Sequence, residues 1–254
     1  MTIDELLTAL TALPHGSNAP NAEQQAVMEY SGGPLWVIAG PGTGKTQGLV
    51  LRTLRLLCVD GVAPEAIVLT TFTRKAAEQL EHRLHETLRL LSRAYPAVGQ
   101  IDVARMHLGT MHSICWELLT DSPASSYRHL HLLDELEQVF FIQTSSRFCT
   151  GATMDETDVL DLLAWAESPD QPVRPTFLPS RWKRAQIFLG LLQRMIEDQV
   201  DLDRLVERYP ALDLLRELIA EYRQALEERH FLDYTLLQQQ TLTWLTSPEG
   251  QAFV

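Results

Sequence analysis

The sequence Ala39-Gly40-Pro41-Gly42-Thr43-Gly44-Lys45-Thr46 sets the architecture that we expect of this chain. It follows an apolar run, residues 35–38, and precedes a segment with a helical pattern, residues 47–59. A strand, a glycine-rich turn and a helix in this order are the context of a phosphate-binding loop. Glycines let backbone N–H groups approach a polyphosphate closely, and the helix N-terminus adds the positive end of its dipole.

The residues of this loop have distinct expected roles. The backbone of residues 40–44 would surround the phosphates, Lys45 would reach the β- and γ-phosphates, and the Thr46 hydroxyl would hold Mg²⁺. The eight-residue pattern usually begins with Gly, where this chain has Ala39, but its Gly-x-Gly-Lys-Thr core is intact. We therefore expect an ATP·Mg²⁺ site in which Lys45 and Thr46 are the catalytic residues. A chance glycine turn is the alternative interpretation.

The composition is that of an ordinary globular protein. Of 254 residues, 45% are hydrophobic and 21% are charged. The chain has no apolar run of the roughly 18 residues that a membrane span requires, and residues 1–13 do not resemble a signal peptide. Its three cysteines lack metal or redox spacing. These features predict a cytoplasmic protein without a membrane partner.

The net charge of −12 is concentrated in the second half of the chain. Residues 1–120 carry 9 basic and 11 acidic side chains, whereas residues 121–254 carry 12 and 22. This balance argues weakly against a nucleic-acid partner, although a narrow basic track on an acidic body remains possible. Arg181, Lys183 and Arg184 form one basic cluster, for which a solvated face is a better interpretation than a duplex-DNA contact.

The first 120 residues alternate between strand and helix patterns. Residues 66–72 are β-rich, and residues 101–110 are a further candidate strand. Asn21 and Gln24 have the spacing of a capping box at the start of a helix. Helical patterns cover residues 1–13, 22–30, 47–59, 73–91 and 111–119. This alternation predicts an α/β fold with a parallel sheet.

The pattern changes after the turn signal at residues 121–123, and no convincing strand follows. Helices are predicted over residues 134–148, 156–167, 181–198, 201–208, 211–229 and 233–246. We expect three parts: an α/β lobe over residues 1–120, a helical subdomain over residues 121–230, and a helical return toward the first lobe over residues 231–254.

A P-loop enzyme also needs an acidic residue that binds Mg²⁺ and activates water, usually at the end of a buried strand. The best local candidate is Asp134-Glu135, but residues 127–131 are too polar for a central strand. Asp134 with Glu137 fits the start of a helix instead. A self-contained P-loop ATPase or kinase with Asp134-Glu135 as Walker B is one alternative function. A non-catalytic module that binds a nucleotide or a partner is another.

Four motifs in family order resemble those of UvrD/Rep/PcrA-type superfamily 1A DNA helicases. Asn21-x-x-Gln24 resembles the Q motif, and residues 33–46 resemble the strand and Walker A loop that follow it. Thr71-Phe72-Thr73-Arg74-Lys75-Ala76-Ala77 resembles motif Ia, and Gly109-Thr110-Met111-His112-Ser113 resembles motif Ib. The resemblance implies a RecA-like P-loop NTPase fold with an incomplete parallel sheet and an inserted all-helical subdomain.

The resemblance also implies roles for individual residues. Gln24 would read the adenine, and Gln47 stands where relatives often have an Arg that lies against this base. From the residues alone, Gln24 as a helix-capping residue is an equal interpretation. The implied DNA-binding residues are Phe72, which would stack on a base, Thr73, Arg74 and Lys75, which would contact phosphate, and Thr110 and His112, which would hydrogen-bond the DNA backbone. A core aromatic and ordinary helix caps are the alternatives.

In that family an Asp-Glu-x-Gln-Asp strand follows soon after the position of Val254. The resemblance thus implies the front part of a longer helicase, which acts on single-stranded DNA and at junctions of single- and double-stranded DNA with ATP and Mg²⁺. It further implies that the Walker B strand and the second RecA-like domain lie in the rest of that protein. We expect the chain alone to have no appreciable ATPase or unwinding activity.

Overall fold

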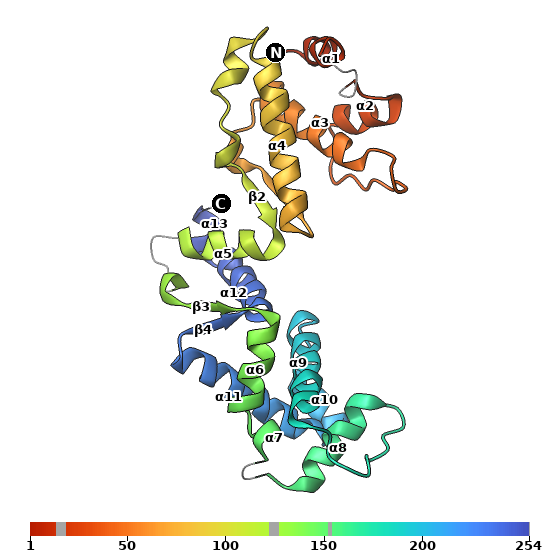
Figure 1. Ribbon diagram of the computed structural model, residues 1–254, viewed down its shortest axis with the longest axis vertical. Helices are drawn as coiled ribbons and strands as arrows, with labels where there is room; N and C mark the ends of the chain where they lie inside the picture. The colour runs from red at the N-terminus through yellow and green to blue at the C-terminus, as the bar shows by residue number, and fades with distance from the viewer. Residues whose placement is uncertain (14–18, 122–126, 152–153, 254) are drawn as a thin grey trace. The chain divides into compact units, whose positions relative to one another are not determined.

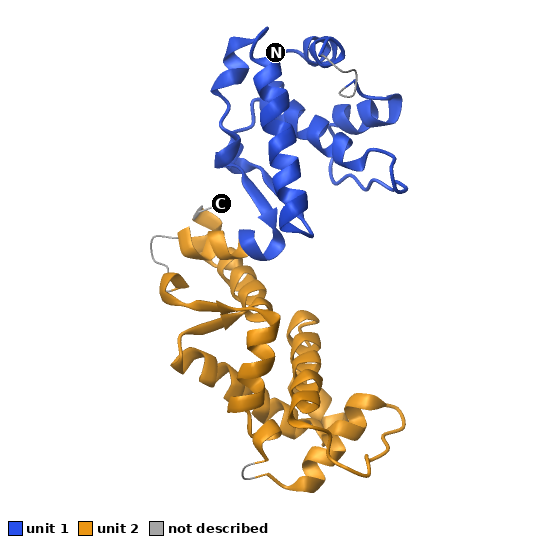
Figure 2. Cartoon of the chain, viewed as in Figure 1, with its two compact units in different colours: residues 1–114 blue, residues 115–254 orange. Residues whose placement is uncertain are grey.

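The computed structural model describes residues 1–13, 19–121, 127–151 and 154–253 (Figure 1). The chain divides into two compact units, residues 1–114 and 115–254 (Figure 2), and each has its own hydrophobic core. The predicted turn at Ser122 and Pro123 lies outside the described residues. The expected division into three parts stays a prediction.

Unit 1 contains a strand–helix–strand crossover. Strands β1 (Val68–Thr71) and β2 (His107–Thr110) pair in parallel, with Thr71 opposite Thr110, and α4 (Arg74–Leu91) connects and packs on them. The other helices of the unit are α1 (Ile3–Thr11), α2 (Ala22–Glu29), α3 (Lys45–Cys58) and the beginning of α5 (Met111–Asp121). Single 3₁₀ turns occupy Pro64–Ala66, Pro96–Gln100 and Val103–Arg105. The parallel α/β arrangement predicted for this part is present.

Helical periodicity accounts for the core of unit 1. The buried leucines of α4 recur every three or four residues, so that one face of the helix is apolar. This face packs on α3, which in turn contacts α1, and the apolar faces of the three helices form one core. The principal buried side chains are Leu6, Leu10, Val50, Leu51, Leu54, Leu57, Leu80, Leu84, Leu88 and Leu91.

The strand predicted over residues 35–38 is wrong for this structure. The segment has no regular secondary structure, and the side chains of Trp36 and Ile38 are 87% and 90% exposed. A strand exists only through hydrogen bonds to a neighbour. Within the described ranges, β1 pairs with β2 alone, and no strand pairs with residues 35–38.

Unit 2 is largely helical, as predicted. It contains the rest of α5 and a 3₁₀ turn at Tyr127–His129. Its further helices are α6 (Glu135–Ser145), α7 (Arg147–Thr150), α8 (Glu156–Glu167), α9 (Arg181–Glu197), α10 (Leu202–Arg208), α11 (Leu212–Glu228), α12 (Tyr234–Thr246) and α13 (Pro248–Phe253). The single helix predicted over residues 134–148 is interrupted at Ser146, whose backbone is extended.

The prediction that no strand follows residue 120 is wrong. Strands β3 (His131–Leu133) and β4 (Phe231–Asp233) pair in parallel, with Leu133 opposite Asp233. Three residues are too few to show the alternation of a strand, and the partners lie 100 positions apart in the chain. The polar residue His131 is tolerated because its side chain is exposed.

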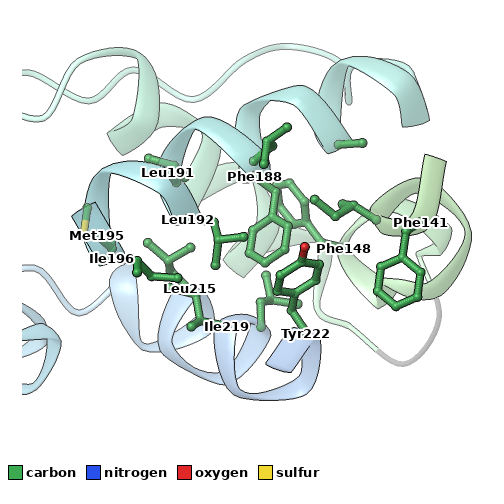
Figure 3. Packing of buried hydrophobic residues seen from close by; sticks show 14 of the residues in the cluster. Phe141, Phe148, Phe188, Leu191, Leu192, Met195, Ile196, Leu215, Ile219 and Tyr222 are labelled. Carbon is green, nitrogen blue, oxygen red and sulfur yellow. The ribbon is translucent and has the colours of Figure 1, made fainter. Parts of the chain in front are cut away.

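The core of unit 2 is built around aromatic side chains from four helices (Figure 3). Phe148 and Phe188 are fully buried, and the ring of Tyr222 stands edge-on to those of Phe141 and Phe188. Arg184 is also buried: its Nη1 and Nη2 donate to the carbonyls of Phe148 and Cys149, each at 2.8 Å. This residue therefore supports α7 and does not belong to a surface cluster with Arg181 and Lys183.

None of the described helices combines the length and the apolar composition that a membrane span requires.

Candidate functional site

The glycine-rich loop exposes the beginning of α3. Gly42 and Gly44 have φ angles of 75° and 84°, in the left-handed region that glycine adopts at little cost. Gly44 is the N-cap of α3, and it supplies no side-chain cap. The first turn of α3 also contains no acidic residue. The N–H groups of this turn have no intrahelical acceptors, so the site favours a bound anion.

Two side chains fold over the loop. The Nζ of Lys45 donates to the carbonyls of Ala39 at 3.1 Å and Gly40 at 2.8 Å, and the Oγ1 of Thr43 donates to Gly40 O at 2.9 Å. The side chain of Thr46 is exposed in the first turn of α3. A positive charge and unsatisfied N–H groups thus occupy one side of the loop.

Gln24 joins α2 to this loop. Its Oε1 accepts from Asn21 N at 3.2 Å, while Asn21 Oδ1 accepts from Gln24 N at 2.8 Å, which completes a capping box. Its Nε2 donates to Gly44 O at 3.4 Å. The side chain therefore caps α2 and touches the loop at the same time, and the adenine-reading role of Gln24 stays a prediction.

The close approach of Gln24 gives Gly44 a second reason to be glycine. A Cβ atom at position 44 would lie 2.4 Å from Gln24 Nε2, which is too close for two non-bonded atoms. Any other residue would displace the amide as well as strain the backbone.

These elements enclose a pocket of about 690 Å³. Of the predicted nucleotide-binding residues, Gln24, Gly40, Thr43, Gly44 and Lys45 line it. Pro41, Gly42, Thr46 and Gln47 are not among its lining residues. The prediction missed an apolar wall from Leu35, Val37 and Ile38 and a polar wall from Arg52. Gly44, Gly48 and Arg52 have the i, i+4 spacing of residues on one helix face, and this spacing is the signal that could have placed Arg52 in the pocket.

Among the described residues, no group of three or more His, Cys, Asp or Glu side chains could hold a metal ion. The Thr46 hydroxyl stands at the helix start that carries the anion site. Mg²⁺ usually keeps several waters and takes few protein ligands beside substrate phosphates, so one hydroxyl donor fits such an ion.

A second group of predicted residues lies at the carboxyl edge of the β1–β2 pair. Because Thr71 is opposite Thr110, Phe72 and Met111 leave the sheet at the same edge. The side chain of Phe72 is fully exposed, and that of Met111 is half-exposed. The register therefore brings motifs Ia and Ib together.

Hydrogen bonds fix the turn after each strand. Thr73 caps α4, since its Oγ1 accepts from Ala76 N at 3.2 Å, and Thr71 Oγ1 donates to Thr73 O at 2.9 Å. The first turn of α4 contains no acidic residue, and the side chains of Arg74 and Lys75 are exposed. This helix start thus presents two cations beside the aromatic ring of Phe72.

The other turn explains the sequence of motif Ib. Thr110 Oγ1 accepts from Ser113 N at 3.2 Å, and Ser113 Oγ donates to Thr110 O at 2.9 Å. A Cβ at position 109 would lie 2.3 Å from Ser113 Oγ, so Gly109 and Ser113 belong to one arrangement. His112 lies in the first turn of α5, and its side chain is half-buried.

Asp134 and Glu135 belong to unit 2, whereas the glycine-rich loop belongs to unit 1. Asp134 follows β3 and forms a capping box for α6: its Oδ1 accepts from Glu137 N at 2.8 Å, and Glu137 Oε2 accepts from Asp134 N at 2.9 Å. The interpretation of Asp134 as a helix cap is confirmed.

Comparison with known proteins places the chain among helicase domains. Residues 20–253 match the family described as the UvrD/REP helicase N-terminal domain. The chain is 40% identical to the ATP-dependent DNA helicase SRS2 of Saccharomyces cerevisiae over 116 residues, which are 45% of this chain and 8% of that protein.

The chain also matches parts of two bacterial relatives. The ATP-dependent DNA helicase Rep of Buchnera aphidicola is 26% identical over 186 residues, 72% of this chain and 24% of that protein. The DNA helicase II of Haemophilus influenzae is 34% identical over 119 residues, 47% of this chain and 14% of that protein. The matched stretches cover less than a quarter of these three relatives.

Proposed function

Since the chain belongs to the UvrD/REP helicase N-terminal domain family, we propose that it supplies the ATP-binding and single-strand-binding surfaces of an ATP-dependent DNA helicase. The resemblance inferred from the four sequence motifs is confirmed by this family assignment. A RecA-like architecture with an inserted helical subdomain is part of the proposal. So is its action at junctions of single- and double-stranded DNA.

The geometry of the glycine-rich loop supports ATP as the nucleotide. The start of α3 would hold the phosphates by its N–H groups, Lys45 would neutralise them, and Thr46 would bind Mg²⁺, which screens the phosphate charge. Adenine offers an amino group and a ring nitrogen side by side. The amide of Gln24, which both donates and accepts, is complementary to this pair.

The exposure of Phe72 is the observation that carries the DNA part of the proposal. Its ring stands fully exposed at the sheet edge, beside two cations and the capped start of α4. An aromatic face stacks on any base, and neighbouring cations bind the backbone phosphates, so this combination suits a single strand without sequence preference. Arg74 and Lys75 would contact phosphate, and Thr110 and His112 would contact the strand at the end of β2.

Titration of a labelled oligothymidylate into the chain at low salt, followed by fluorescence anisotropy, tests this part. Stacking of one base contributes roughly 1–3 kcal/mol, so Phe72→Ala should weaken binding by about fivefold to 150-fold. Phe140→Ala removes a half-exposed phenylalanine of unit 2 and serves as the matched control. Equal affinities of the wild type and Phe72→Ala would contradict the assignment.

Titration with Mg·ATP by calorimetry tests the nucleotide part. Lys45→Ala should abolish binding, because it removes the cation nearest the phosphates, whereas Gln24→Ala should weaken it only in part. Mg²⁺-dependent hydrolysis that is lost in Glu135→Gln would favour the self-contained ATPase instead. Nucleotide binding without affinity for DNA would favour the non-catalytic module.

A further inference from the structure

Helix α2 has little apolar packing of its own. It has only eight residues, and Met28 alone among them is buried. A helix this short is not stable in isolation, because nucleation costs more than a few hydrogen bonds return. The segment that follows it, residues 30–38, is exposed. The position of α2, and of Gln24 on it, must therefore depend on specific contacts with α3, on which it packs.

Two arginines of α3 bind the carboxyl end of α2. Arg52 Nη1 donates to Val27 O at 3.2 Å and also to the carbonyl of Tyr30. Arg55 Nη1 donates to Met28 O at 2.9 Å and to Tyr30 O at 3.1 Å. The last carbonyls of a helix have no intrahelical donor and form the negative end of its dipole. The two guanidinium groups donate hydrogen bonds to these carbonyls and also place positive charge at this end.

The other end of α2 is bound to the beginning of α3. Gln24, in the first turn of α2, donates to the carbonyl of Gly44, the N-cap of α3. Gly44 and Arg52 are eight residues apart on α3, about 12 Å along its axis. Both attachments of α2 therefore lie on one rigid helix, and the length of α2 between them fixes where the amide of Gln24 stands.

We propose that Arg52 and Arg55 are positioning residues for adenine recognition: by holding the carbonyls of Val27, Met28 and Tyr30, they set the distance between the Gln24 amide and the glycine-rich loop. The inference rests on the proposed binding of ATP. Arg52 has the more direct part, since it lines the same pocket as Gln24. Arg55 is itself held by Asp60, whose Oδ2 lies 3.3 Å from Arg55 Nε.

A double-mutant cycle measures this coupling. Calorimetry would give the affinities of the wild type, Arg52→Gln, Gln24→Ala and the double variant for Mg·ATP and for Mg·tripolyphosphate, which has no base. Arg52→Gln should lower the affinity for Mg·ATP about tenfold, as the loss of one well-placed hydrogen bond would. Its affinity for Mg·tripolyphosphate should stay within about twofold of that of the wild type. The double variant should bind Mg·ATP no more weakly than Gln24→Ala, because Arg52 acts through Gln24.

Two further variants separate positioning from general stability. Arg52→Lys keeps the charge at the end of α2 but loses the planar fork, so it should retain more selectivity for ATP over tripolyphosphate than Arg52→Gln. Arg89→Gln removes an exposed arginine of α4 and should change neither affinity. Equal weakening of both ligands by Arg52→Gln, or additive effects of Arg52→Gln and Gln24→Ala, would overturn the proposal.

A measurement without nucleotide keeps this inference distinct from the proposed function. Hydrogen exchange should show that the amides of residues 26–30 lose protection in Arg52→Gln/Arg55→Gln, and the side-chain amide resonance of Gln24 should shift. A wild type that binds neither ligand would reject the proposed function, and these two signals would still decide the placement of Gln24. Unchanged protection and an unchanged resonance would overturn the role of both arginines.

Discussion

The two units share a local arrangement, a parallel strand followed by a capped helix, but the side chains at the end of the strand point in opposite directions. Within the described residues, each has one pair of parallel strands, and each of these strands is followed within two residues by a helix with a side-chain cap. At the end of β1 the chain turns an aromatic ring outward at Phe72, followed by two exposed cations. At the end of β4 it turns a carboxylate inward at Asp233, whose side chain is 0% exposed.

The inward carboxylate is fully engaged by its neighbours. Asp233 Oδ2 accepts from the hydroxyl of Tyr222 at 2.6 Å and from Gln138 Nε2 at 2.8 Å, and Oδ1 accepts from Leu236 N at 2.7 Å. These bonds join α6, α11 and α12 at the end of β4. The comparison teaches that the side chain at the carboxyl end of the strand decides whether this edge packs inward, as at Asp233, or presents a surface, as at Phe72.

Of the substitutions that test this comparison, replacement of Asp233 by alanine should have the largest effect on stability. It would leave the buried Tyr222 hydroxyl without its acceptor, and Gln138 Nε2 would keep only its bond to that hydroxyl oxygen, at roughly 1–3 kcal/mol in each case. It would also remove the cap of α12, at about 1 kcal/mol. We expect a loss of about 3–5 kcal/mol in the unfolding free energy of unit 2. Urea titration followed by tryptophan fluorescence reports it, since Trp116, Trp165, Trp182 and Trp244 lie in unit 2.

The same carboxylate should give unit 2 a dependence on pH. Burial raises the pKa of Asp233 above its ordinary 3.8, although hydrogen bonds from Leu236 and Tyr222 oppose the shift. A raised pKa means that stability present below pH 3.8 is lost as the pH rises through the pKa of the folded state. The stability of the wild type minus that of Asp233→Asn should therefore fall as the pH rises above 4. A difference that grows over this range would show a carboxyl group that prefers to be charged.

Gly109→Ala should destabilise the exposed edge of unit 1, with a smaller loss of unfolding free energy than Asp233→Ala causes in unit 2. The added Cβ would displace the Ser113 hydroxyl, which lies 2.3 Å from its position, and so disturb the turn that Thr110 and Ser113 form. We expect unit 1 to lose roughly 1–2 kcal/mol, seen as faster hydrogen exchange in β1 and β2.

Ser113→Ala provides the control for this substitution. The Cβ of residue 113 would be 3.5 Å from the added methyl group, an ordinary contact. The double variant should therefore be about as stable as Ser113→Ala alone. Additive losses would show that Gly109 is required for a reason other than the Ser113 hydroxyl.

The features that the sequence predicts well are those set by nearby residues. The long amphipathic helices α4, α9 and α11 were predicted to within one or two residues, because their apolar periodicity is itself the cause of their packing. The cap at Asp134 was also predicted, since a capping box is complete within four residues. The pairing of β1 with β2 follows from the order of strand, helix and strand.

The features that escaped prediction depend on residues far apart in the chain. The β3–β4 pair joins segments 100 residues apart, and three-residue strands show no period of their own. Arg184 looks like a surface cation in sequence, yet its partners are carbonyls of another helix. Arg52 was missed in the same way, because a backbone carbonyl leaves no mark in the sequence of its partner.

Removal of single caps should give the smallest and most informative difference between the two units. Thr73→Ala and Asp134→Ala each delete a helix cap, so each should cost about 1 kcal/mol and expose the first turn of α4 or α6 to faster hydrogen exchange. Thr73→Ser and Asp134→Asn keep a side-chain acceptor and are the matched controls. Only Thr73→Ala should also lower the affinity for single-stranded DNA, because the start of α4 would no longer hold Arg74 and Lys75 beside Phe72. Equal DNA affinity of Thr73→Ala and Asp134→Ala would mean that the order of this helix start does not contribute to binding.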